Sequence, residues 1–475
     1  MRQMYRTVFT AVLAASATVY AGAAGAETLT ADRAVKIALQ RSSQAIAARA
    51  GELEARGGLY SAYSQMLPQI TGNWNRSATR TDQQGGSQLF GAFVSPIANV
   101  NSRSYSNDLS LSGSWSVLNL SAIRGLSSGR ASLQSSKMQS RAARNDVALA
   151  TRRQFYEVVK AIQLAGVADS ALRQARNDER RVRALFEVGS VSRSDILKAQ
   201  VATAQSQLDS LSARQNVVVQ RVALADQIGL PEPALGDIDT LLTAEVHQYD
   251  EGALVSEASR DRPDLLAAEA SLNAANAALS SARLARLPYL SVSGSAEFSP
   301  FSSFTRKQFG TFPITEPFLN PDSSIGSRVV GYETDPETSG RSTIDRIYRG
   351  TVAINWDIFS GFATDARIAS ARANVLRALD ARDALRRNLE AEVHQSLLDY
   401  RRALESREVT IRALDAAAEN LNLIQQKYNV GSATILELVD ARVNLQRAQS
   451  DHVSALAGIR VAEAAIDRVR GRGAD

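Results

Sequence analysis

Four segments of the chain alternate apolar and polar residues with a period of two. They cover residues 70–74, 109–117, 290–298 and 352–358, and serine fills the polar positions of the second segment. This alternation is the pattern of a strand with one apolar face. A segment of about ten residues also has the length that a tilted strand needs to cross an outer membrane. The three tryptophans lie in these segments, where an interfacial aromatic belt would place them. The pattern therefore predicts four strands.

Two polar stretches, residues 81–104 and 299–347, separate the strands of each pair and are predicted to be loops. Four strands are too few to close a barrel, because the smallest such barrels use about eight. In lipid, an open sheet would expose two edges at a cost of several kcal/mol per unpaired backbone group. If the strands lie in a membrane, several copies of the chain must share one barrel. The alternative is a half-buried sheet of a soluble protein.

Two long segments, about residues 121–187 and 362–429, carry apolar residues at heptad spacing. A helix of about 67 residues spans about 100 Å at about 1.5 Å per residue. Gly189 and Gly431 follow these segments and predict a reversal of the chain. A returning helix is expected to reach Ile228 in the first case and Arg470 in the second.

The chain contains two copies of one large unit, because four markers recur in the same order at nearly constant spacing. The recurring markers are Leu67-Pro68 with Leu287-Pro288, Trp115 with Trp356, Val188-Gly189-Ser190 with Val430-Gly431-Ser432, and Asp195-Ile196-Leu197 with Glu437-Leu438-Val439. Leu-Pro is expected to end a helix before each strand pair, since the residue before proline is pushed out of the α region.

The N-terminus predicts an exported protein. Residues 1–26 read as a signal peptide, with Arg2 and Arg6 before a short apolar stretch and Ala24-Gly25-Ala26 before a cleavage site at Glu27. The mature chain is then divided into a first repeat, a linker and a second repeat. The predicted divisions are 27–230 with a strand hairpin at 69–117 and a tip near 189, 231–262 as the linker, and 263–475 with a strand hairpin at 289–359 and a tip near 431.

Composition excludes several classes of function. The formal net charge of +5 comes from arginines dispersed among acids, which does not indicate nucleic-acid binding. The chain has no cysteine, so a lipid-anchored N-terminal cysteine is excluded. Apart from the signal, no segment is apolar enough for a transmembrane helix. The chain is not expected to be an enzyme. The serine motif at residues 125–129 lies in a Ser/Gly-rich helix start, and the three histidines lack metal-ligand spacing.

The signal peptide, the Leu-Pro helix ends, the long helices, the Val-Gly-Ser tips and the duplication together resemble the TolC-like outer membrane efflux family. The most specific segment is residues 428–442, and residues 186–197 form its weaker counterpart. The resemblance implies a mainly α fold with a β-barrel part. Each protomer would give four strands to a shared transmembrane barrel, and long antiparallel coiled-coil helices would form a periplasmic tunnel.

The resemblance also implies a function. The chain would be a homotrimeric exit duct in the outer membrane, serving a tripartite efflux system or type I secretion without a cofactor. A periplasmic adaptor protein and an inner-membrane transporter would dock at the helix tips, residues 188–190 and 430–432. The alternative from the residues alone is a periplasmic coiled-coil adaptor or structural protein.

Four residues match the positions with which the family closes its periplasmic end. Glu437 and Asp440 match acidic rings and lie three residues apart on one side of a helix, whereas Asp195 and Tyr428 match lock positions. The arginine usual in that lock is replaced by Ala433, and nearby Arg193 is a candidate replacement. The alternative for Glu437 and Asp440 is a solvated pair at a helix start, favoured by the helix dipole.

Overall fold

The computed structural model describes residues 28–473 except 85–86, 91–92, 97–98, 244–245, 309–311 and 334–336. The predicted signal peptide lies outside the described residues. The helices are α1 (Ala31–Arg41), α2 (Ser43–Ser64), α3 (Leu120–Glu187), α4 (Arg193–Ile228), the short η1 (Glu232–Leu235), α5 (Glu251–Asp261), α6 (Pro263–Leu284), α7 (Ala363–Asn429) and α8 (Ile435–Val469). The strands are β1 (Gln69–Gln83), β2 (Ser87–Phe90), β3 (Phe93–Pro96), β4 (Asn99–Leu118), β5 (Tyr289–Gln308), β6 (Phe312–Leu319), β7 (Ile325–Glu333) and β8 (Glu337–Asn355).

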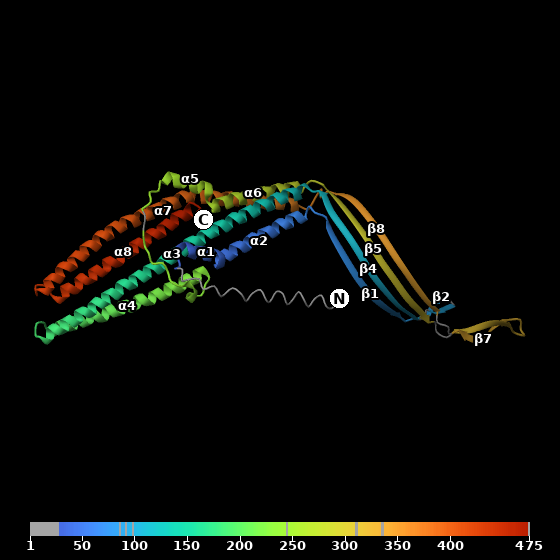
Figure 1. The fold of residues 1–475 in the computed structure, drawn as a ribbon. Coiled ribbons are helices and arrows are strands. Elements are labelled where there is room, and N and C mark those ends of the chain that lie inside the picture. Colours follow the sequence, from blue (N-terminus) through green and yellow to red (C-terminus); the bar gives the residue numbers. More distant parts are fainter. Residues whose placement is uncertain are drawn as a thin grey trace. The chain divides into compact units, whose positions relative to one another are not determined.

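The chain forms two compact units, and each unit draws on both repeats. The sheet unit consists of Gly58–Gly129 and Asn276–Ala373, and the helical unit contains the rest of the described chain. Figure 1 shows the long helices α3, α4, α7 and α8 and the long strands β1, β4, β5 and β8. The two long helices expected from the heptads are confirmed, with starts within one residue of those predicted. Within the described residues, none of the helices combines the length and the apolar character that a bilayer crossing requires.

The main sheet is antiparallel and has the order β1-β4-β5-β8. Its strands are 15–20 residues long, so the expectation of about ten residues per strand is wrong. Much of the two stretches predicted to be loops continues the same ladders, and β6 and β7 pair separately within the second stretch. The reason is that backbone pairing needs no apolar side chains, so the strands outlast the alternation that revealed them.

Each helix that precedes the sheet ends in the same way. The indole N–H of Trp115 donates to the carbonyl of Met66 at 2.8 Å, and that of Trp356 donates to the carbonyl of Arg286 at 3.1 Å. Both carbonyls directly precede a Leu-Pro pair and therefore lie where a helix leaves carbonyls without partners. Trp356 lies one residue beyond β8, so the expectation that all three tryptophans lie in strands holds only for Trp74 and Trp115.

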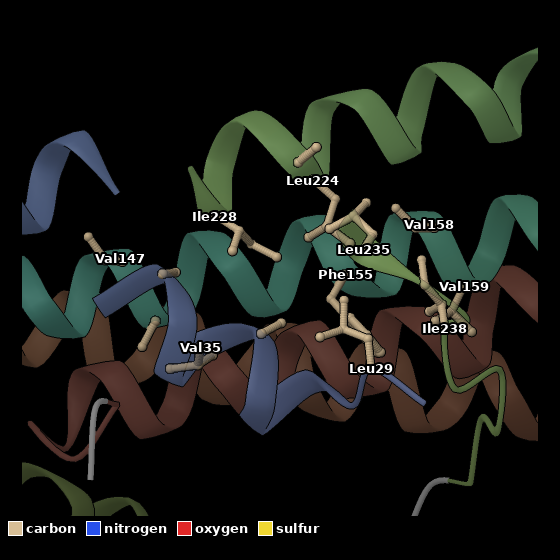
Figure 2. Close-up of a cluster of buried hydrophobic side chains, with 14 of the residues drawn as sticks. Leu29, Val35, Val147, Phe155, Val158, Val159, Leu224, Ile228, Leu235 and Ile238 are labelled. Atoms are coloured by element: carbon tan, nitrogen blue, oxygen red, sulfur yellow. The ribbon is translucent and has the colours of Figure 1, made fainter. Parts of the chain in front are cut away.

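Each repeat has its own hydrophobic core in the helical unit. The first core packs α1 against α3 and α4, with Phe155 and Leu224 among its buried side chains (Figure 2). The second packs α5 and α6 against α7 and α8, around Leu389, Tyr400 and Ile459. Asp169, which interrupts the heptads of α3, accepts hydrogen bonds from Ser210 and Arg214 of α4, so a polar link replaces apolar packing there.

A glycine follows each of α4 and α8 at the point where the chain passes close to the end of a short helix, α1 or α5. Gly229 after α4 has φ +76°, and a Cβ there would lie 2.7 Å from the carbonyl oxygen of Arg41. Gly471 after α8 has φ +83°, and its Cβ would lie 2.8 Å from the carbonyl oxygen of Asp261. Both positions therefore need glycine for the left-handed backbone and for the close approach of a second backbone.

We predict that Gly229→Ala lowers stability by about 2 kcal/mol or more, because backbone strain adds to the clash. Gly431→Ala is the matched control, since Gly431 has φ +80° but nothing within 4 Å of an added Cβ. It should cost only about 1 kcal/mol of left-handed strain. Thermal unfolding followed by circular dichroism measures both variants. Equal losses would show that the contact with Arg41 does not matter.

Candidate functional site at the helical tips

The two tips have the same backbone. At the first, the N–H of Ser190 donates to the carbonyl of Leu185 at 2.8 Å. At the second, the N–H of Ser432 donates to the carbonyl of Lys427 at 2.9 Å. Gly189 and Gly431 adopt φ +73° and +80° within these turns, which gives each helix a Schellman-type end. Val188 and Val430 are strongly exposed beside them, so each tip presents a small apolar surface.

Asp195 and Glu437 occupy equivalent places, at the third position of α4 and of α8. Asp195 accepts from the N–H of Ser192 at 3.1 Å and from its hydroxyl at 2.7 Å. Glu437 accepts from the N–H of Thr434 at 2.7 Å and from its hydroxyl at 3.1 Å. Each acid therefore completes a capping box that starts the return helix.

These hydrogen bonds favour the ionised acids. The hydrogen bond from the Ser192 hydroxyl is the main cause that lowers the pKa of Asp195. The hydrogen bond from the Thr434 backbone is the main cause that lowers the pKa of Glu437. Asp440 is exposed three residues further along α8. Glu437 therefore caps the start of α8, and no such cap is described for Asp440.

The lock residues are not joined to each other in this structure. The carboxylate of Asp195 is bonded to Ser192 and lies 3.6 Å from the ammonium of Lys198. The hydroxyl of Tyr428 is buried and has no hydrogen-bond partner within the described part of the chain. Burial raises the pKa of Tyr428. Arg193, the candidate replacement for the missing arginine, is exposed as the first residue of α4.

An apolar cluster joins the two hairpins close to the tips. Its buried members are Val182 of α3, Ala199 of α4, and Ile435 and Leu438 of α8. Tyr428 packs against the same cluster. This is the one of the three buried clusters in the described chain that takes residues from both repeats. The packing therefore holds one repeat against the other at this end of the helical unit.

An ion pair between a buried carboxylate and a half-buried guanidinium lies beside this cluster and also crosses between the hairpins. Nε of Arg442 on α8 lies 2.8 Å from Oδ2 of Asp178 on α3, and its Nη2 donates to Oδ1 at 3.0 Å. Arg442 also donates to Gln174 of α3 and, at 3.1 Å, to Gln425 of α7. One guanidinium therefore connects three long helices. Arg181 of α3 adds a bond of 3.0 Å to the side chain of Asn429.

Two opposing effects act on this ion pair: burial disfavours the charges, and their mutual attraction favours them. Asp178 is only 8% exposed, and burial raises its pKa although Arg442 acts in the opposite direction. Burial likewise lowers the pKa of Arg442. Loss of hydration thus opposes the charged form of both groups, whereas their mutual attraction favours it. A cavity of about 470 Å³ borders the pair and is lined by both residues together with Gln446 and Ser450. The contact therefore links the two hairpins through a buried carboxylate and a half-buried guanidinium.

Sequence reasoning did not identify this pair. Arg442 ends the most specific tip motif, but Asp178 lies in an arginine-rich stretch that gives no local signal. The two residues are 264 positions apart, so only the packing of the hairpins reveals the contact.

The sequence of the chain is similar to those of known outer membrane proteins. Residues 254–472 match the family described as outer membrane efflux protein. Over 312 residues the chain is 22% identical to outer membrane protein TolC of Escherichia coli (strain K12). That match covers 65% of this chain and 57% of the relative, so it spans less than two thirds of the relative's length.

Solved outer-membrane channels share the fold. The channel OprN matches with a TM-score of 0.69 at 20% identity, over 94% of this chain and 90% of its own. VceC of Vibrio cholerae gives 0.68 at 16% identity, over 93% and 96%. The open state of MtrE of Neisseria gonorrhoeae gives 0.68 at 19% identity, over 94% and 89%. The expected fold class is therefore confirmed for the chain: mainly helical, with a sheet part.

We predict that Asp178→Ala destabilises the protein by roughly 1–3 kcal/mol, because it leaves Arg442 buried without its counter-ion. The double variant Asp178→Leu/Arg442→Met should lie close to the unsubstituted protein, since it removes both charges. Asp399→Ala, which breaks an exposed pair with Arg402, should change stability by less than about 0.5 kcal/mol. Thermal unfolding measures all three variants. Additive losses in the double variant would contradict a coupled pair.

Proposed function

We propose that this chain is the outer-membrane exit duct of a tripartite efflux or type I secretion system, because residues 254–472 match the outer membrane efflux protein family and the chain is similar to TolC. Three copies surround one passive channel that crosses the outer membrane and extends into the periplasm. Export is driven by the inner-membrane transporter and not by chemistry in this chain.

The apolar face of the sheet carries this proposal. The register places Leu111 beside Gly72 and Ala296, and Trp115 beside Val292, so the apolar residues of four strands share one face. Many of them are exposed in the single chain: Ile70, Trp74, Leu109, Leu111, Tyr348, Val352 and Ile354. The opposite face is rich in serine, including Ser112 and Ser293. A lipid-facing surface with a polar interior has this alternation.

The edges of the sheet support a shared barrel. β1 and β8 are the outer strands of the sheet order, so each has a neighbour on one side only. In lipid, unpaired backbone groups along such long strands would cost several kcal/mol each. Pairing β8 of one copy with β1 of the next removes both edges, and three copies close the barrel. A periplasmic adaptor, the alternative function, has no need of this sheet.

The tips form the docking site for the periplasmic adaptor. Their backbone turns are exposed, and the valines at 188 and 430 add apolar surface that a partner helix can cover. The buried pair of Asp178 and Arg442 holds the two hairpins together beside this site and acts as the latch of the closed duct.

The proposed latch has a defined pH dependence. A raised pKa means that Asp178 binds a proton more readily when the hairpins are packed than when water separates them. Lowering the pH through that raised pKa therefore favours the packed tip. Glu437 behaves oppositely. Its lowered pKa stabilises the capped helix start while it is ionised, and this contribution is lost as the pH falls through the lowered value.

The oligomer can be tested directly. The protein should fractionate with the outer membrane, resist carbonate extraction and give a trimer after cross-linking in mild detergent. A carbonate-extractable monomer with intact strands by circular dichroism would contradict the duct and favour the periplasmic adaptor.

The acidic ring gives a second prediction. In a trimer, Glu437 and Asp440 would each occur three times around one axis and favour cations in the pore. Glu437→Gln/Asp440→Asn should weaken cation selectivity and divalent block in planar-bilayer recordings. Asp195→Asn alters the equivalent capping box on the other hairpin and a lock position, so it should instead raise conductance and leave the cation selectivity unchanged. Unchanged selectivity in the double variant would leave these acids as helix starts only.

The docking site gives a third prediction. Gly431→Trp should abolish transport while trimer formation and membrane insertion persist, because a bulky side chain would obstruct the adaptor at the tip. Gly166→Ala is the control, since Gly166 lies within α3 with nothing near an added Cβ. Normal transport by Gly431→Trp would exclude this tip from the docking site.

A further inference from the structure

We propose that the apolar face of the main sheet carries a binding site for a phosphorylated lipid of the external leaflet, formed by Arg80, Arg103 and Arg306. The proposal rests on the proposed function, because it takes this face as the lipid-facing surface of an outer-membrane duct. It goes beyond that function by assigning a ligand to one part of the surface, near the strand ends that lie away from the Leu-Pro helix ends.

The register of the four long strands shows which side chains share a face (Figure 1). Trp74, Leu109 and Phe298 lie opposite one another on β1, β4 and β5. Six residues further along β1 and β4, Arg80 lies directly opposite Arg103. Residues an even number apart on a strand point to the same side. Arg80 and Arg103 therefore belong to the apolar face.

This face carries several arginines and little negative charge. On the described parts of β1, β4, β5 and β8, Asp82 is the one acid that the register places on it. The opposite face mixes acids with bases, among them Asp108, Glu297 and Arg341. The excess of positive charge thus lies on the apolar face, where the arginines are Arg76, Arg80, Arg103, Arg306 and Arg346.

Aromatic residues place the outer arginines at the level of lipid headgroups. On the apolar face of β4, Trp115 and Tyr105 are exposed and lie ten residues apart, the length that a tilted strand needs to cross the hydrocarbon layer. Aromatic residues at both ends of such a crossing mark the two interfaces. Arg103 lies two residues beyond Tyr105, or about 7 Å along the strand. This distance reaches into the headgroup layer, which is about 5–7 Å thick on each side.

The charge of the three arginines is only partly balanced within the chain. Arg80 lies 2.8 Å from Asp82, whereas Arg103 and Arg306 have no ion-pair partner among the described residues. Like charges directly opposite each other on neighbouring strands destabilise a sheet, as Arg80 and Arg103 do here. Arg306 faces Asn101 and is therefore a diagonal neighbour of Arg103, at about 7–8 Å. A bound anion relieves this repulsion.

Phosphate is the anion that best suits these side chains, because a guanidinium donates two parallel hydrogen bonds to its oxygens. Three arginines and one acid leave a net charge of +2, which matches a headgroup with two phosphates. Phe304 lies opposite Arg103 on the same face and is 54% exposed. A phosphorylated lipid can therefore contact both the arginines and the apolar surface beside them, whereas a free phosphate can contact the arginines only.

The site can be tested with diphosphoryl lipid A as the probe. Arg103→Gln/Arg306→Gln should weaken its binding about tenfold or more, because two of the three phosphate-binding guanidinium groups are lost. Native mass spectrometry of the purified protein, titrated with the lipid in nonionic detergent, measures the bound fraction. Monophosphoryl lipid A should bind the unsubstituted protein more weakly than the diphosphoryl form.

Arg341→Gln is the matched control. Arg341 pairs with Ser303, beside the residue that faces Arg103, but it lies on the opposite face of the sheet. This variant should bind lipid A as the unsubstituted protein does. If circular dichroism shows that the glutamine double variant has lost its strands, Arg103→Lys/Arg306→Lys replaces it. Lysine keeps the charge but cannot form the two parallel bonds, so binding should still weaken several-fold.

Three results would overturn the proposal: unchanged binding by the folded double variant, an equal loss in Arg341→Gln, or complete displacement of lipid A by inorganic phosphate. The second indicates a general effect of charge, and the third a site for free anions. In each case, a protein that still resists carbonate extraction as a trimer retains the proposed function. A protein that carbonate extracts as a monomer loses both, because the site requires the membrane.

Discussion

The structure depends on one constraint: in a single copy, the outer strands of the sheet lack a backbone hydrogen-bonding partner on one side. These strands are β1 and β8, and unpaired backbone is costly in lipid. In the sheet, one open edge comes from the first repeat and the other from the second. The duplicated sequence thus produces a sheet whose two edges are different.

Periodicity predicted most of the fold because the longest helices repeat the same heptad spacing of apolar residues along their length. Heptads and tip glycines placed α3 and α7 nearly to the residue, and the return helix of the first repeat ends at Ile228 as expected. The strands were underestimated because their outer halves are held by backbone bonds between polar residues, which leave no alternation to detect. The prediction that Trp356 lies in a strand was wrong, because β8 ends one residue earlier and the indole N–H instead caps the end of the preceding helix.

The site was less predictable than the fold. The capping boxes of Asp195 and Glu437 are visible as a hydroxyl residue three positions before an acid, and this local signal was present in the sequence. The contact of Asp178 with Arg442 has no such signal, since it joins different repeats and appears only when the hairpins pack.

The paired glycines at the ends of α4 and α8 have a consequence for how the two halves of the chain unfold. Gly229 and Gly471 make the same close approach to a short helix in each half, so each half completes its own core around its own closure. Each half thus carries a core and a closure of its own, so the two halves are expected to unfold as separate cooperative units. The two closures differ in sequence, because Arg262 stands after α5 where Ser42 stands after α1.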